Sequence, residues 1–194
     1  MFSIIIATSD SERALVPTLA ALVPGATAGI VREVIIADGG SRDETADVAE
    51  IAGCRFMSSS QPLGARLRAA AAAARGTWLM FLTPGVVPEP TWIDETIAFR
   101  EDSVRRDEAR AAVFAPGRAR TRDMLGPVRR WLGAPPRPEQ GLMIPKSLYD
   151  ELGGHSAKAR DPETDLARRL GRRRLVTLRT AASTASMPIF DFGK

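Results

Sequence analysis

The sequence predicts an α/β protein with a mostly parallel central sheet flanked by helices, and two observations support this. Strand-like, β-branched runs alternate along the chain with segments whose apolar residues recur at helical spacing. The strand-like runs are apolar at successive positions, as in parallel sheets covered by helices on both faces. The chain has 194 residues, 44% of them hydrophobic, so we expect a single domain over residues 1–194 with a sizeable core.

The first hundred residues contain three strand–helix repeats followed by a fourth strand. A first helix is expected to run through Leu15, Leu19 and Leu22 and to stop at Pro24-Gly25. The remaining elements expected here are strands at 2–7, 33–37, 55–57 and 77–82 and helices at 43–52 and 63–74. Right-handed crossovers would join such strands into a parallel sheet, whose ligands bind at the carboxyl ends of the strands.

After the fourth strand the sequence predicts one more helix and then becomes irregular. Pro88-Glu89-Pro90-Thr91 has the start signals of a helix that runs to about Arg100, and an Arg-rich connection follows. Asp161-Pro162 has the pattern of an N-cap and a first-turn proline for a helix through Leu170. The other elements expected are strands at 142–144 and 175–178 and a helix at 146–152 closed by Gly153-Gly154.

Charge is distributed unevenly between the two halves. Residues 1–100 hold 8 Lys/Arg and 11 Asp/Glu, net −3, whereas residues 101–194 hold 19 and 12, net +7. The basic half suits an anionic partner such as a diphosphate or a phospholipid surface, although a merely solvated basic surface is the commoner explanation. Nucleic acid is not expected as a partner, because only 6% of the residues are aromatic and none is interleaved with the arginines.

The sequence suggests a cytoplasmic protein. Cys54 is the single cysteine, which excludes an intramolecular disulfide and a Cys-rich zinc site. The chain starts directly on strand-like sequence without the pattern of a signal peptide, and no apolar run approaches the roughly 20 residues that span a bilayer. We therefore expect a cytoplasmic location, with peripheral contact at the inner face of the membrane left open.

Several motifs, in order, resemble the family 2 glycosyltransferases of the GT-A fold. The segments that carry the resemblance are 3–8 (SIIIAT), 33–43 (EVIIADGGSRD), 72–78 (AAARGTW), 139–142 (EQGL) and 165–170 (DLARRL). The resemblance extends over nearly the whole chain and is greatest to a small bacterial subgroup. It implies a Rossmann-like GT-A domain with a nucleotide-binding half at 1–100 and a basic acceptor-side half at 101–194.

The resemblance also implies which residues border the nucleotide. The family's turn after the first strand corresponds to Thr8-Ser9-Asp10-Ser11, so Thr8 and Asp10 are candidate nucleotide contacts. Asp38 corresponds to the acid that accepts a hydrogen bond from the base, although it could equally form the turn ahead of the next helix. Arg66 lies where the family often has a basic residue near the diphosphate, and its alternative role is an exposed helical arginine.

The family's metal-binding acids are missing. The fourth strand of family members normally ends in Asp-x-Asp or His-Ala-Asp, and Thr83-Pro84-Gly85 stands there. A magnesium ion typically needs one or two carboxylates, and a threonine hydroxyl is a weak substitute. We therefore expect neither Mg nor Mn at the usual site and no other cofactor.

The catalytic motif is altered as well. Family members have a Glu-Asp-x-Asp-Leu stretch whose second acid deprotonates the acceptor, and this chain has Pro162-Glu163-Thr164-Asp165-Leu166. The resemblance therefore implies Glu163 as the base and includes Asp165 in the catalytic set. A helix start without any chemistry explains the same residues: Asp161 as N-cap, Pro162 at the first position and Glu163 in the first turn.

Two further features have ordinary explanations. His155, the only histidine, follows Gly153-Gly154 where the family often has an aromatic residue, and a loop histidine is the simplest interpretation. Met124, Leu125, Val128, Trp131 and Leu132 form an apolar face in a basic segment. That face could rest on an anionic membrane that holds lipid-linked acceptors, or it could be buried in the core of the protein.

Two functions from different classes follow from these patterns. The first is an inverting glycosyltransferase that uses a nucleotide-sugar and works without the usual metal. The second is a catalytically degenerate GT-A protein that serves as a nucleotide-binding or protein-interaction module. The sequence identifies neither the nucleotide, nor the sugar, nor the acceptor.

Overall fold

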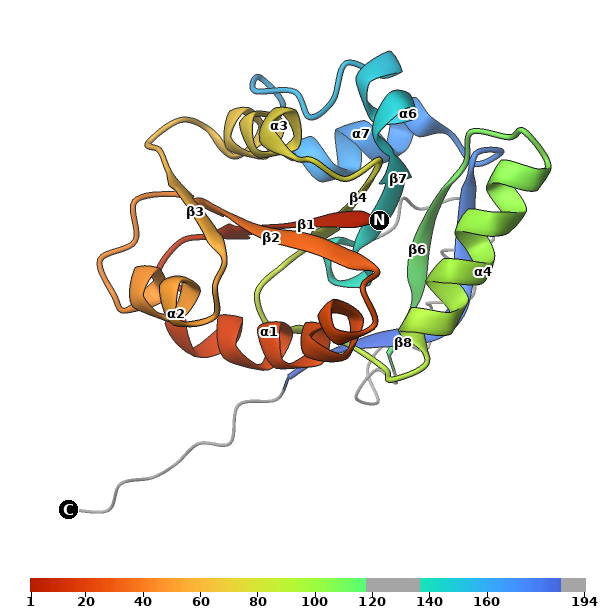
Figure 1. Ribbon diagram of the computed structural model, residues 1–194. Helices are drawn as coiled ribbons and strands as arrows, with labels where there is room; N and C mark the ends of the chain where they lie inside the picture. The colour runs from red at the N-terminus through yellow and green to blue at the C-terminus, as the bar shows by residue number, and fades with distance from the viewer. Residues whose placement is uncertain (118–136, 186–194) are drawn as a thin grey trace.

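The computed structural model describes residues 1–117 and 137–185, and in this part of the chain eight strands form one sheet (Figure 1). The strands are β1 (Phe2–Thr8), β2 (Val31–Asp38), β3 (Arg55–Ser58), β4 (Trp78–Leu82), β5 (Val86–Pro88), β6 (Ala111–Pro116), β7 (Leu142–Pro145) and β8 (Leu175–Thr184). Their order across the sheet is β3-β2-β1-β4-β7-β6-β8-β5. Strands from both halves of the chain therefore share one sheet.

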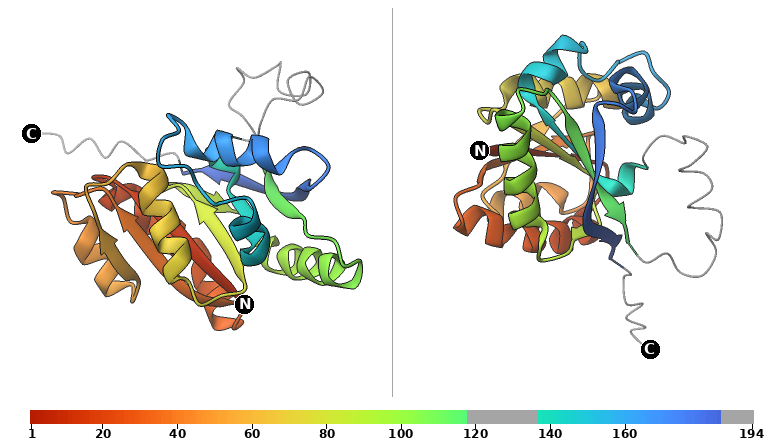
Figure 2. Two further views of the ribbon diagram at one scale, coloured as in Figure 1. Left: turned by 90° about the horizontal axis from the view of Figure 1, so that it is seen from above. Right: turned by 90° about the vertical axis from the view of Figure 1, so that its right-hand side faces the viewer.

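Helices cover both faces of the sheet. They are α1 (Glu12–Thr27), α2 (Thr45–Ile51), α3 (Leu63–Ala73), α4 (Trp92–Arg105), α6 (Lys146–Glu151) and α7 (Pro162–Leu170), with a short 3-10 helix, η1 (Pro138–Gln140). Helices α1, α2 and α4 contribute to the core on one face, and α3, α6 and α7 to the core on the other (Figures 1 and 2). The predicted α/β class with flanking helices is thus confirmed. No described helix is long and apolar enough to cross a membrane.

Strand β1 shows why its sequence is apolar at successive positions. Phe2, Ile4 and Ile6 pack in the core on the α1 side, whereas Ile5 packs in the core on the α3 side, and all four side chains are fully buried. Since successive side chains of a strand point to opposite faces, both faces of β1 are covered.

The parallel part of the sheet places three strand ends at one edge. Strand β1 pairs in parallel with β2 and β4, and β2 pairs in parallel with β3. The register puts Thr8 beside Asp38 and Asp38 beside Ser58. The carboxyl ends of these strands form the edge where ligands bind in open α/β sheets.

The first helix is longer than expected. We predicted that it stops at Pro24-Gly25, but α1 continues to Thr27. Pro24 lacks only one backbone donor, and the last turns are held against α4, where the Trp92 indole N–H donates to the Ala21 carbonyl at 3.2 Å. A Cβ at Gly25 would lie 2.5 Å from the Trp92 ring, so Gly25 provides space for the indole rather than a helix stop.

Strands β5 and β6 were not predicted, and β8 extends beyond the predicted 175–178. Each of these strands depends on a neighbour that is remote in sequence, since β6 pairs with β8 and β7, and β5 pairs with β8. A run of three residues such as Val86–Pro88 is too short to show a strand-like alternation of apolar and polar residues.

Candidate functional site

Asp38, at the carboxyl end of β2, is the centre of a dense hydrogen-bond cluster. Its side chain is buried, with 1% exposed. One carboxylate oxygen accepts from the Thr8 hydroxyl at 2.9 Å and from the Ser41 hydroxyl. The other accepts from the backbone N–H groups of Gly40 (2.7 Å) and Ser41 (2.9 Å) and from the Ser58 hydroxyl (3.0 Å). Five protein donors therefore use the acceptor capacity of this carboxylate, which offers about four lone-pair sites.

The hydrogen bonds determine the charge state of Asp38. Burial on its own would raise the pKa of this carboxyl, but the donors from Ser41, Gly40 and Thr8 outweigh burial and lower the pKa to about 2. Asp38 is therefore ionised at neutral pH, and its charge organises the ends of β1, β2 and β3.

The other predicted nucleotide contacts lie around the same edge. Arg66, on α3, donates through Nη1 to the carbonyl oxygens of Thr8 (3.0 Å) and Ala37 (2.7 Å). Asp10 has φ +46° and accepts from the Arg42 backbone N–H at 2.7 Å. The structure thus brings Thr8, Asp10, Asp38 and Arg66 together, and it engages all four in internal hydrogen bonds.

The end of β4 has no set of acids that fits a divalent cation. Gly85 has φ +88°, and its N–H lies 2.8 Å from the Ala14 carbonyl and 2.9 Å from the Thr18 hydroxyl, both on α1. The Thr83 hydroxyl lies 3.5 Å from the Pro138 carbonyl. Among residues 1–117 and 137–185, no group of three or more His, Cys, Asp or Glu side chains could hold a metal ion. The residues at the usual position therefore do not fit Mg or Mn.

Glu163 lines an open pocket between α7 and the middle of the sheet. The other lining residues are Phe81, Val113, Arg137, Pro138, Gly141, Leu142, His155 and Ala167. Helix α7 starts as its sequence predicts, because the Asp161 carboxylate accepts from the Thr164 backbone N–H at 3.0 Å and Pro162 occupies the first turn. This start places the Glu163 side chain in the pocket, so the helix-start explanation and the catalytic one are compatible.

The environment of Glu163 favours its neutral form. Burial is the main cause, with the negative charges of Asp161 and Glu139 adding to it, and together they raise the pKa of Glu163 to about 7. Among the described residues, no group donates a hydrogen bond to this carboxyl. A carboxyl with a pKa near 7 in an open pocket is well suited to general acid–base catalysis.

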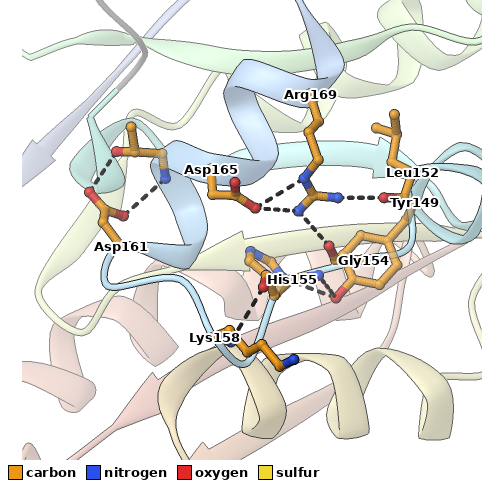
Figure 3. Close-up of polar contacts among 10 residues, drawn as sticks. Tyr149, Leu152, Gly154, His155, Lys158, Asp161, Asp165 and Arg169 are labelled. Atoms are coloured by element: carbon orange, nitrogen blue, oxygen red, sulfur yellow. Dashed lines mark hydrogen bonds and ion pairs between the residues drawn. The ribbon is translucent and has the colours of Figure 1, made fainter.

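Asp165 lies two residues further along α7, and its side chain contacts Arg169 instead of the pocket. Its carboxylate pairs with Arg169, at 3.0 Å from Nε and 2.8 Å from Nη2 (Figure 3). Arg169 also donates to the carbonyl oxygens of Leu152 and Gly154, the latter at 2.7 Å. Asp165 therefore holds an arginine that fixes the turn before His155, and it does not line the pocket.

His155 is the functional candidate that sequence reasoning missed. It is fully buried, and its Nδ1 lies 2.9 Å from the Tyr149 hydroxyl (Figure 3). Its ring packs edge-on against Phe81 at 4.7 Å between ring centroids, and it lines the same pocket as Glu163. Its place after two glycines suggested a loop, and nothing local in the sequence predicts its burial. The predicted apolar face at 124–132 lies outside the described residues.

The architecture, with a sheet edge that gathers Thr8 and Asp38 and a pocket that contains Glu163, is of the GT-A type. The chain belongs to glycosyl transferase family 2, whose sequence profile matches residues 3–157. This match ends before α7, so the assignment of Glu163 rests on its motif and on the pocket. No curated protein matches the chain.

Solved structures agree on the fold. Glucosyl-3-phosphoglycerate synthase from Mycobacterium tuberculosis, in complex with Mn²⁺, uridine diphosphate and glucosyl-3-phosphoglycerate, aligns with a TM-score of 0.69 at 19% identity, covering 97% of this chain and 73% of that one. S. aureus TarS 1–349 in complex with UDP aligns with a TM-score of 0.71 at 16% identity, covering 96% and 61%. The chain thus spans less than two thirds of the TarS fragment.

Proposed function

We propose that this protein is an inverting glycosyltransferase that moves a sugar from a nucleotide-sugar to an acceptor hydroxyl, with Glu163 as the base. The observation that carries the proposal is the Glu163 carboxyl, which lines the pocket, accepts no hydrogen bond from the described residues and has a pKa of about 7. The match to the glycosyltransferase family supports the reaction class. The position of Glu163 in the pocket supports its role as the base.

The proposed reaction is a single displacement. The acceptor oxygen attacks the anomeric carbon, Glu163 takes the proton of the acceptor hydroxyl, and the bond between the anomeric carbon and the diphosphate oxygen breaks. A base with a pKa near the working pH is half ionised there and still accepts a proton readily. Attack from the face opposite the diphosphate inverts the anomeric configuration.

The proposal assigns no step to a metal ion. The leaving diphosphate would instead be stabilised by positive charge, for which Arg66 is a candidate because its guanidinium lies at the ends of β1 and β2. Two similar structures are described with UDP or UDP-glucose bound, which makes a uridine nucleotide the first donor to test.

The test combines a donor panel with a chelator. Purified protein is incubated with UDP-glucose, other UDP-sugars and GDP-mannose, with water standing in for the acceptor hydroxyl, and released nucleoside diphosphate is measured with excess EDTA and with manganese. We expect release with at least one donor, retained in EDTA and lost in Glu163→Gln. Activity that EDTA abolishes would contradict the metal-free reaction, and full activity in Glu163→Gln would contradict the assigned base.

A second candidate function is a non-catalytic binding module. It is favoured by Asp38, whose carboxylate is occupied by five internal donors, and by Gly85, whose backbone is bonded to α1 instead of facing a ligand. Calorimetry with UDP-glucose separates the two functions: binding without release of UDP under any condition supports the module, and turnover excludes it.

A further inference from the structure

The Tyr149–His155 pair contains a polar atom that has no partner in the part of the chain that the structure describes. The Tyr149 hydroxyl accepts a hydrogen bond from the His155 backbone N–H at 3.1 Å and lies 2.9 Å from His155 Nδ1. His155 Nε2 is buried and has no hydrogen-bond partner among the described residues. Buried polar atoms are almost always paired, so an unpaired ring nitrogen beside a pocket requires an explanation.

The contacts determine which ring nitrogen carries the proton. The Tyr149 hydroxyl has one proton, and among the described residues Nδ1 is the acceptor within reach. Nδ1 is therefore the acceptor, and the proton of the neutral ring lies on Nε2. Burial, with the charge of Arg169 as the next cause, lowers the pKa of His155 to about 3, so the ring stays neutral at physiological pH.

The Nε2–H group lies on the side of the ring that faces away from Tyr149. Nδ1 points to Tyr149, and in Figure 3 the other ring nitrogen points away from Tyr149, toward α7. Helix α7 carries Glu163, and both His155 and Glu163 line the pocket. A ligand in this pocket would therefore meet a neutral donor on one wall and the Glu163 carboxyl on another.

We propose that His155 donates a hydrogen bond from Nε2 to a hydroxyl oxygen of the sugar bound beside Glu163. This rests on the proposed function, because the base of a single displacement must lie next to the sugar that reacts. His155 is then a substrate-binding residue that the family match does not assign.

A neutral hydroxyl suits this pocket better than an anion does. The ring offers a donor without a positive charge, and Glu163 and Glu139 place negative charge nearby. Arg137, which also lines the pocket, already has an interaction of its own. Much of the remaining wall is apolar, including Phe81, Val113 and Leu142. A few oriented polar groups on an apolar wall are typical of pockets that bind small ligands, and sugars present both hydroxyls and C–H faces.

The donor is held rigidly before any ligand arrives. The ring packs edge-on against Phe81, and its backbone N–H is bound to Tyr149. The preceding turn is held by Arg169, which donates to the Gly154 carbonyl at 2.7 Å. These contacts fix the orientation of the ring before a sugar binds.

The single histidine makes the proposal testable by NMR on the whole protein. Ring-¹⁵N-labelled protein gives the tautomer directly, and we expect the neutral Nε2–H form from pH 5 to pH 8. UDP-glucose should shift the Nε2–H resonance and slow its exchange with water, whereas UDP should leave it unchanged. An Nδ1–H tautomer would overturn the proposal, as would binding of UDP-glucose, seen by calorimetry, without a change at Nε2.

Failure of the proposed function gives a different result. If UDP-glucose does not bind by calorimetry, the sugar-transfer assignment fails for this donor and the His155 proposal fails with it. If UDP-glucose binds and is turned over while Nε2 is unaffected, only the His155 proposal fails.

Two variants supply a kinetic readout. His155→Phe keeps a ring against Phe81 but removes the donor, and we expect a loss of about tenfold in kcat/KM for UDP-glucose, as for one hydrogen bond. His155→Gln places an amide N–H near the position of Nε2 and should recover part of the loss. Equal kcat/KM for wild type and His155→Phe, with melting temperatures confirming that both are folded, would overturn the proposal.

Discussion

Asp165 forms an ion pair with Arg169, one helical turn away on α7, at 2.8 Å between Oδ2 and Nη2. The same guanidinium binds the carbonyl oxygens of Leu152 and Gly154. The two acids of the α7 motif therefore face different surroundings, because Glu163 lines the pocket while Asp165 secures the turn that leads to His155. A single short motif thus combines a proposed chemical group with a structural one.

Asp165→Asn should affect stability more than chemistry. Loss of the ion pair removes the partner that orients Arg169, and partly exposed pairs of this kind contribute about 1 kcal/mol to the free energy of unfolding. We expect urea unfolding to show a loss of that size, with kcat reduced less than tenfold. A 100-fold fall in kcat with unchanged stability would instead place Asp165 in the chemistry.

Glu163→Gln should affect the chemistry more than the stability of the fold. The amide has nearly the same shape but cannot take a proton, and general-base catalysis typically contributes about 10²–10⁴-fold. We expect kcat to fall by at least about 100-fold with little change in KM, measured by release of nucleoside diphosphate. Glu151→Gln on α6 is a matched control, because this exposed side chain does not line the pocket and should leave kcat unchanged.

The pKa of Glu163 predicts two pH dependences. Catalysis requires the ionised form, so kcat should rise about tenfold per pH unit below about 7 and level off above it. The contribution of Glu163 to the free energy of unfolding should instead fall as the pH rises. The folded state holds this proton up to about pH 7, whereas the unfolded state releases it near 4.5, so the stabilising contribution is complete below pH 4.5 and is lost as the pH rises to 7.

The stability effect can be isolated with the same variant. Glu163→Gln has no charge to bury, so at pH 8 it should exceed wild type in the free energy of unfolding by on the order of 2 kcal/mol, with the difference vanishing near pH 4. Urea unfolding at the two pH values measures this. A difference that is independent of pH would mean that the pKa of Glu163 is not raised.

Asp38→Asn should destabilise the sheet edge. The folded-state pKa of Asp38 is about 2 against an ordinary 3.8, so its contribution is complete above about pH 4 and is lost as the pH falls toward 2. At pH 7 we expect a loss of about 2 kcal/mol, because an amide cannot accept from five donors. Asp150→Asn, at an exposed position on α6, is the control and should change stability little.

How far the sequence predicts this fold depends on whether an element is defined locally. Strand β1 is predicted because Ile4 to Ile6 form a β-branched apolar run, and α7 because Asp161 and Pro162 mark its start. Strands β5 and β6 escape prediction because pairing with β8 defines them. The sequence predicts a helix stop at Gly25, because it does not show that the Trp92 ring lies against this residue.

How far the sequence predicts the candidate site also depends on whether a feature is local in the sequence. The motifs place Thr8, Asp38 and Glu163 in the correct parts of the fold, because strand ends and a helix start are local features. The partners of these residues are not local: Asp38 is bound by Ser58, and His155 is bonded to Tyr149 and follows a turn that Arg169 holds. Sequence patterns therefore predict where these candidate residues lie in the strands and helices, but they do not show which hydrogen-bond partners each residue has.

Gly85 stands where family members carry a metal-binding acid, and its backbone conformation can be tested by substitution. Its φ of +88° is a conformation that residues with a Cβ rarely adopt, and an ideal Cβ there would lie 3.9 Å from the Ala14 Cβ. The expected cost of Gly85→Ala, about 1–2 kcal/mol in urea unfolding, therefore comes from the backbone and not from crowding. Gly53→Ala, with φ +69° and nothing within 4 Å, calibrates that cost.

The same geometry predicts that restoring acids does not restore a metal site. A side chain at position 85 would point toward α1, because its Cβ lies beside Ala14 and the Gly85 N–H is bonded to Ala14 and Thr18. The double variant Thr83→Asp/Gly85→Asp should thus be less stable than wild type and bind manganese no better by calorimetry. Tight manganese binding together with manganese-stimulated release of nucleoside diphosphate would show instead that this edge keeps the geometry of a metal site and lacks only the acids.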